Sequence, residues 1–130
     1  MSFDTIRQSL ESYVNANWAG VPMAYDNVPF TPPSNGAAWV RMTIQEAGRE
    51  IHEIGAVSAD TVGLVSFQIF TPKDSGTAAA RQIADQLATL LDIKNISGVK
   101  TQVLRLRKAG FREDYEQHNA DVPFEFNAIV

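Results

Sequence analysis

The apolar residues of this chain follow two different periods, and this limits the fold more than any other feature of the sequence. In two segments they recur every three or four residues, which is typical of an amphipathic helix. In four other segments they alternate with polar residues, which is typical of a half-buried strand. The order is helix, strand, strand, helix, strand, strand. The chain has 130 residues, the length of one ordinary domain, so we expect a single domain over residues 1–130.

Both predicted helices carry one apolar stripe. The first covers residues 3–17, has Ser2 in position to cap it and Asp4 in its first turn, and its stripe is Phe3, Ile6, Leu10, Tyr13 and Val14. The second follows "TPKDSG", with Asp74 or Ser75 as the expected cap, and its stripe is Ala79, Ile83, Leu87, Leu90 and Leu91.

The strand patterns are equally regular. Residues 38–45 place Val40 and Met42 on one side and Trp39 on the other, and residues 61–70 place Phe67 and Ile69 on one side. Two further strands are expected around Leu104 and across residues 122–128. We interpret residues 45–60 as a long connection, and residues 110–120 as a loop or a strand extension. The expected fold is α+β, a two-layer sandwich in which a mixed or antiparallel sheet of about four strands is covered by two helices.

Catalytic motifs are incomplete. His52 and Glu53 match the start of a zinc-protease helix motif, but Ala56 stands where the second histidine is required. The chain has no cysteine, and the Gly76 segment lacks the phosphate-loop pattern, so capping explains it without a ligand. We therefore predict no catalytic residues, no metal, no cofactor and no enzyme activity. A small ligand-binding domain that uses the helix start at residues 74–77 is the alternative.

Charge and hydropathy add two expectations. No apolar run reaches the length of a membrane helix, so we expect no membrane partner. The formal net charge of −4 gives no reason to expect specific binding of nucleic acid.

A proline-rich segment, "YDNVPFTPPSNGAAWVRM" at residues 25–42, precedes the first predicted strand. Its prolines restrict the backbone, so burial against a neighbour would cost less conformational entropy. Phe30 and Trp39 belong to the residue types that are enriched in interface cores. The same aromatic side chains could instead cover the core of their own chain. The sequence leaves both interpretations open.

Several phrases of the sequence resemble the tail terminator proteins of long-tailed bacteriophages. They are "DNVPFTPPSNGAAWVRM", "FQIFTPKDSGTAAARQIADQL" and the aromatic strand that closes the chain, and the similarity runs over nearly the whole length. The polar segment after Gly110 departs from the family wording.

The resemblance implies a structural virion protein of the tail or neck, made in the host cytoplasm. It implies a homo-oligomeric, hexameric ring that caps the tail tube, stops its polymerisation and docks the head–tail connector protein. The tail tube protein would then be a partner, and DNA would pass through the lumen without specific binding. The alternative is another neck component, either a head–tail connector or a tail completion protein.

We predict three contact regions for such an assembly. The first is the proline segment, with Phe30, Pro32 and Trp39 against the adjacent subunit. The second is the connection at residues 46–60, against the tube or a neighbour, through Glu46, Arg49, Glu50 and Glu53. The third is a basic stripe, Arg105 and Arg107, paired with carboxylates of a partner.

Overall fold

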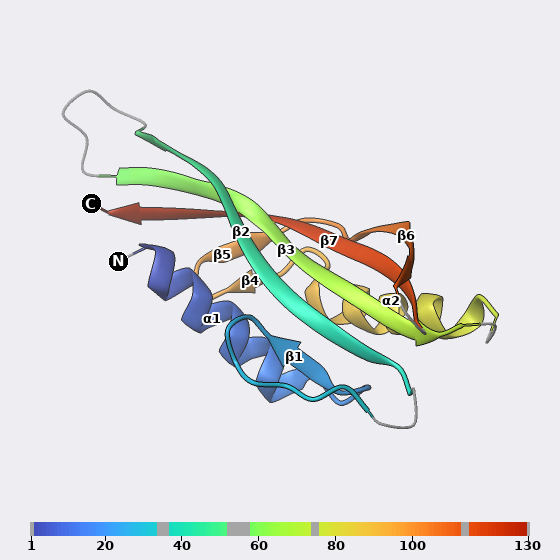
Figure 1. Ribbon diagram of the computed structural model, residues 1–130. Helices are drawn as coiled ribbons and strands as arrows, with labels where there is room; N and C mark the ends of the chain where they lie inside the picture. Colours follow the sequence, from blue (N-terminus) through green and yellow to red (C-terminus); the bar gives the residue numbers. More distant parts are fainter. Residues whose placement is uncertain (1, 34–36, 52–57, 74–75, 113–114, 130) are drawn as a thin grey trace.

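One curled, mixed sheet of seven strands forms a half-barrel, and two helices lie against one of its faces (Figure 1). The computed structural model describes residues 2–33, 37–51, 58–73, 76–112 and 115–129. The elements follow in the order α1 (Ser2–Asn17), β1 (Met23–Tyr25), β2 (Trp39–Ile51), β3 (Ser58–Pro72), α2 (Ala78–Leu91), β4 (Asn95–Ile96), β5 (Val99–Thr101), β6 (Arg105–Arg112) and β7 (Tyr115–Ile129).

Strand β7 is central to the sheet. Along one side it pairs antiparallel with β3, from Ser58 opposite Ile129 to Pro72 opposite Tyr115. On its other side it pairs with β5 near its C-terminal end and with β6 near its start. The remaining order is β1-β2-β3 on one flank, where the β1–β2 pair is parallel, and β5-β4 on the other.

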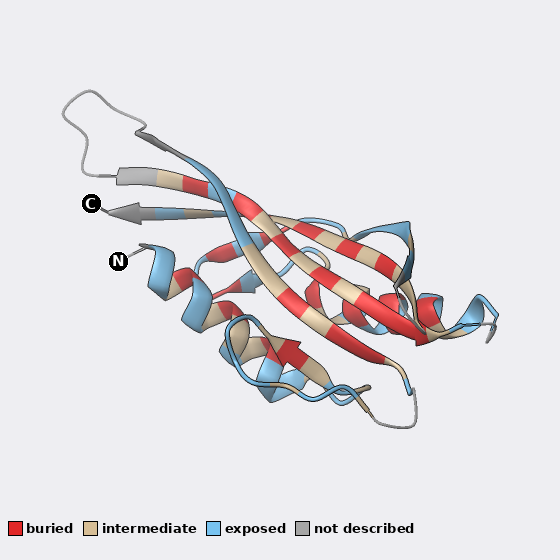
Figure 2. Ribbon diagram, viewed as in Figure 1, coloured by how far each residue is buried: buried red, intermediate tan, exposed pale blue. Residues whose placement is uncertain are grey.

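The core lies between the helices and the inner face of the sheet. Rows such as Met42–Phe67–Ala120 cross three strands, and the alternation of buried and less buried residues follows β2, β3 and β7 (Figure 2). The helices contribute Ile6, Leu10, Val14, Ala80, Ile83, Ala84, Leu87 and Leu91. Burial of each large apolar side chain contributes roughly 1.5–3 kcal/mol. The predicted helices and the inward residues Val65, Phe67 and Ile69 are confirmed.

The predicted two-layer sandwich with a sheet of about four strands is wrong. Residues 46–51 and 58–60, expected in a connection, extend β2 and β3, and residues 115–120 belong to β7. Within the described residues, the glycine and the charged residues that indicated a loop pair between β2 and β3 instead: Gly48 with Val62, Arg49 with Thr61 and Glu50 with Asp60. Strands β1, β4 and β5 have only two or three residues each, too few to show a period.

Two glycines have a structural reason, which is a close contact for one and a positive φ for the other. A Cβ on Gly63 would lie 2.3 Å from the Gln45 carbonyl oxygen, beside the bulge where β2 shifts register between Glu46 and Gly48. Gly98 has a φ of +93° in the turn that joins β4 to β5, a conformation that side chains disfavour.

The start of α2 differs from the prediction. Thr77 occupies the N-cap position, without a side-chain capping bond, and the helix begins at Ala78. The expected caps, Asp74 and Ser75, lie outside the described residues. Neither helix in the described part of the chain is long and apolar enough to cross a membrane.

Candidate assembly surfaces

An aromatic cluster lies on the outer face of the sheet, away from the helices. Trp39 is only 7% exposed and stacks between Phe30, at a centroid distance of 5.0 Å, and Phe70, at 4.3 Å. Tyr115 meets both Trp39 and Phe70 edge-on, at 6.3 Å and 6.2 Å. Its hydroxyl donates a long hydrogen bond, 3.5 Å, to the Pro33 carbonyl. The cluster therefore fastens the proline segment to β2, β3 and β7.

This cluster decides where Trp39 packs. Phe70 lies directly opposite Trp39 in the register of β2 and β3, so the indole is buried within its own chain. The indole Nε1 has no hydrogen-bond partner among the described residues. Pro32 is exposed and Phe30 is half-buried, so contact of these two with a neighbouring subunit stays a prediction.

The second predicted region forms an arm, the paired ends of β2 and β3 that extend past α1 (Figure 1). Glu46 is exposed and lies opposite Gly63, and Glu50 lies opposite Asp60. Arg49 belongs to the same strand. Glu53 lies outside the described residues. Glu46, Arg49 and Glu50 thus lie on one strand. Glu46 is at the start of the bulge, and Arg49 and Glu50 follow it.

The third predicted region is β6, an edge strand that pairs only with β7 among the described strands. Arg107 Nε lies 3.5 Å from Asp121 Oδ2, and Ser66 Oγ donates to the other oxygen of this carboxylate at 2.6 Å. Lys108 Nζ lies 3.4 Å from Glu116 Oε2. Arg105 is exposed and has no ion pair among the described residues. Part of the basic stripe is therefore neutralised by its own chain.

Sequence reasoning missed a fourth feature, next to the basic stripe. Phe111 is 64% exposed, and two ammonium groups lie over its phenyl ring, Lys73 Nζ at 5.6 Å and Lys108 Nζ at 5.8 Å. We call these three residues the Phe111 knob. The lone phenylalanine in "KAGFRE" was the available signal, but Lys73 comes beside it only through the pairing of the strands.

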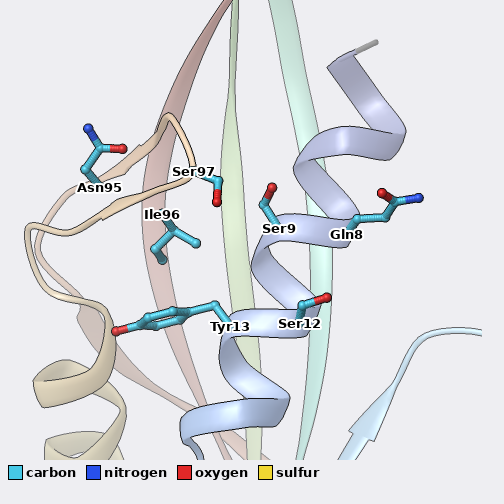
Figure 3. A pocket seen from close by; sticks show the side chains of 7 residues that line it. All are labelled: Gln8, Ser9, Ser12, Tyr13, Asn95, Ile96 and Ser97. Atoms are coloured by element: carbon cyan, nitrogen blue, oxygen red, sulfur yellow. The ribbon is translucent and has the colours of Figure 1, made fainter.

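A hollow of about 600 Å³ separates α1 from the turn after β4 (Figure 3). Its lining is Gln8, Ser9, Ser12, Tyr13, Asn95, Ile96 and Ser97. The Tyr13 hydroxyl already donates to the Leu90 carbonyl at 2.8 Å. The lining contains hydroxyl and amide groups but no base to activate them, so its chemistry fits solvent contact.

His118 faces the core on β7. Its side chain is 3% exposed, and its Nδ1 has no hydrogen bond within the described part of the chain. Burial lowers the pKa of His118 below its ordinary value, nearby Glu116 partly opposes this, and Arg81 and Lys108 add to it. The described residues contain no group of three or more histidines and carboxylates that could hold a metal ion. His52 lies outside them.

Comparison with known proteins identifies the family. The family model described as "Phage tail terminator protein" matches residues 5–119. The chain belongs to the phage tail terminator family. The resemblance seen in the sequence is thereby confirmed, and the family gives the chain a structural role in the phage tail. No curated protein sequence matches.

A similar fold is found among solved structures. One of them has a TM-score of 0.68 to this chain at 19% sequence identity. The match covers 97% of this chain and 96% of that one. At this identity the likeness establishes the fold alone.

Proposed function

We propose that this tail terminator forms a homo-oligomeric ring, hexameric as in the family it belongs to, on the end of the tail tube. The ring stops polymerisation of the tube protein and offers a docking surface to the head–tail connector. The observation that carries this proposal is the family match over residues 5–119. DNA passes through the lumen, and the net charge of −4 favours passage without adhesion to the wall.

The shape of the chain supports an assembly role. The arm, the edge strand β6 and the Phe111 knob are exposed features, built on a sheet whose core is closed by its own helices. Exposed phenylalanine and arginine side chains, such as Phe111 and Arg105, belong to the residue types that are enriched at contacts with other proteins. No nucleophile, base and orienting group come together among the described residues, so nothing there favours catalysis.

Three surfaces are proposed as contacts. The proline segment, with Phe30, Pro32 and the Trp39 that anchors it, meets the adjacent subunit. The arm, with Glu46, Arg49 and Glu50, and Glu53 beyond the described part, meets the tube or a neighbour. Arg105 has no ion pair among the described residues, and together with Arg107 it binds a carboxylate of a partner.

Electron microscopy of phage with an early stop codon in this gene tests the function. Overlong tubes of scattered length, beside heads without tails, are expected. Tails of normal length that fail to join heads would identify another neck component instead. Normal infectious particles would overturn the structural role.

A narrower test addresses the arm. Charge reversal at Glu50 and Glu53 is expected to impair termination, whereas reversal of Asp85, exposed on α2, is the matched control. Intact assembly after reversal of both glutamates would remove the arm from the contacts.

A further inference from the structure

A groove of about 440 Å³ runs between the first half of α1 and the neighbouring part of β2. Apolar side chains, Phe3 and Ile44, lie in it, and Phe3 is 48% exposed. Four carboxylates and one guanidinium share the lining with them: Asp4, Glu11, Asp26, Glu46 and Arg7. The groove therefore combines apolar surface with an excess of negative charge.

Internal pairs leave part of this charge without compensation. Arg7 binds Asp4 at 2.8 Å and Glu11 at 3.3 Å, which uses the one cation among the described residues of the lining. Asp26 accepts a hydrogen bond from Thr43 Oγ1 at 3.1 Å, which leaves its charge in place. Glu46 has no ion pair within the described part of the chain. A cation brought beside Asp26 and Glu46 would gain two carboxylate neighbours.

The Phe111 knob has the complementary chemistry. Its phenyl ring is mostly exposed and would remove apolar surface from water on entering the groove. Its two ammonium groups lie close to the ring, so they would reach the carboxylates as the ring is buried. Lys108 is paired with Glu116, so the knob is partly ordered before binding. Lys73, which has no ion pair among the described residues, therefore carries the uncompensated positive charge of the knob.

Knob and groove lie at opposite ends of the molecule. Strand β6 is at the end where α2 begins, whereas the first half of α1 is at the end near the arm (Figure 1). The groove borders a free edge of β2, because β1 pairs only with Val40, Arg41 and Met42. Two different, complementary patches at opposite ends of one chain give a heterologous contact, which generates a closed ring or an open filament.

We infer that the groove of one copy receives the Phe111 knob of the next copy. The contact is the repeating interface of the assembly, and this inference rests on the proposed ring. The occupant is a second copy of this chain, because the negative charge of the groove is complementary to the positive charge of the knob. Both the groove and the knob belong to the same chain.

Crosslinking in assembled tails tests the contact, since the chain has no native cysteine. The variant Ala47→Cys/Ala109→Cys places one thiol beside the groove and one beside the knob without removing a contact residue, and it is treated with a short bis-maleimide in tails whose tubes have normal length. A ladder of multiples of the chain mass is expected. The control, Asp85→Cys/Ala109→Cys, is expected to give monomers only, because Asp85 is exposed on α2, away from the groove.

The outcomes separate this inference from the proposed function. Tails of normal length that contain the protein but give no ladder would overturn the knob-and-groove contact while leaving termination intact. Crosslinks to the tube protein alone would overturn it too, by giving the groove a different occupant. If the stop-codon phage makes normal tails, the proposed function itself fails.

A charge exchange provides a second test. Glu46→Lys and Lys73→Glu each place like charges across the contact, so each is expected to cut the yield of tails of normal length on the order of tenfold. The double variant restores opposite charges and is expected to recover most of the yield. Failure of both single variants to reduce the yield would contradict the contact.

Discussion

The Trp39 cluster and the Phe111 knob both place an aromatic ring on the sheet, but the two rings differ in how far they are exposed to solvent. Trp39 is 7% exposed and stacked on two rings of its own chain. Phe111 is 64% exposed, and the described residues place two lysine ammonium groups over its phenyl ring. The difference teaches that aromatic residues near an assembly surface divide into those that stabilise the subunit and those that are available to a partner.

The largest effect is expected at Trp39. Trp39→Ala removes a buried side chain between two rings and leaves a cavity, so the free energy of unfolding should fall by ~3–5 kcal/mol. Chemical denaturation of the purified protein measures this. A loss below ~1 kcal/mol, typical of an exposed site, would break the comparison by placing Trp39 among the partner-facing residues.

Asp121 lies on β7 between β3 and β6 and should show an intermediate effect. Its carboxylate accepts from Ser66 Oγ at 2.6 Å and lies near Arg107 on β6. Asp121→Ala should lower the free energy of unfolding by about 1.5–3 kcal/mol, the range for hydrogen bonds to charged groups. Ser66→Ala is the matched control, because it removes the donor but leaves the carboxylate; it should cost less in the same denaturation experiment.

A smaller, pH-dependent effect is expected from His118, which faces the core on β7. Burial lowers its pKa in the folded protein, so the unfolded chain binds the proton more readily. Stability should be complete above pH ~6.5, the unfolded value, and should fall as the pH drops from there toward the lower folded pKa. His118→Gln should flatten this part of the profile of unfolding free energy against pH. An unchanged slope would show that the pKa of His118 is the same in the folded and the unfolded protein.

The smallest effect on the subunit is expected at Phe111 itself. Phe111→Ser changes a mostly exposed side chain, so the free energy of unfolding should stay within ~0.5 kcal/mol of the natural protein. Its effect should appear in tail assembly instead. A large loss of stability with normal tails would reverse the comparison and make Phe111 a residue of the subunit's own core.

The sequence predicted those parts of the fold in which periodicity is uninterrupted. Ile6 and Leu10 on α1, and Phe67 and Ile69 on β3, lie where the stripes placed them, because one face of each element is buried. The arm was missed because Glu46, Gly48 and Glu50 interrupt the alternation, and strands without a covering helix tolerate such residues. The short strands β4 and β5 have too few residues to show a period.

The candidate surfaces were predicted only in part. Arg105 and Arg107 were recognised from their spacing, but the pairing of Arg107 with Asp121 depends on the register of β6 and β7. Both interpretations of Trp39 were open because nothing in the sequence states that Phe70 will lie opposite it. The Phe111 knob depends on Lys73, which the end of β3 brings beside β6. Contacts between distant segments decided each of these points.

The place of β7 in the sheet has a consequence for biosynthesis. The ribosome makes β7 after β3, β5 and β6, yet all three strands pair with it. Until residues 115–129 leave the exit tunnel, the hairpin of β2 and β3 has a long unpaired border, a state that favours association with other nascent chains. Closure of the sheet therefore waits for β7, so a chain terminated before this strand would be a substrate for chaperones or proteases rather than a subunit that blocks the growing tail.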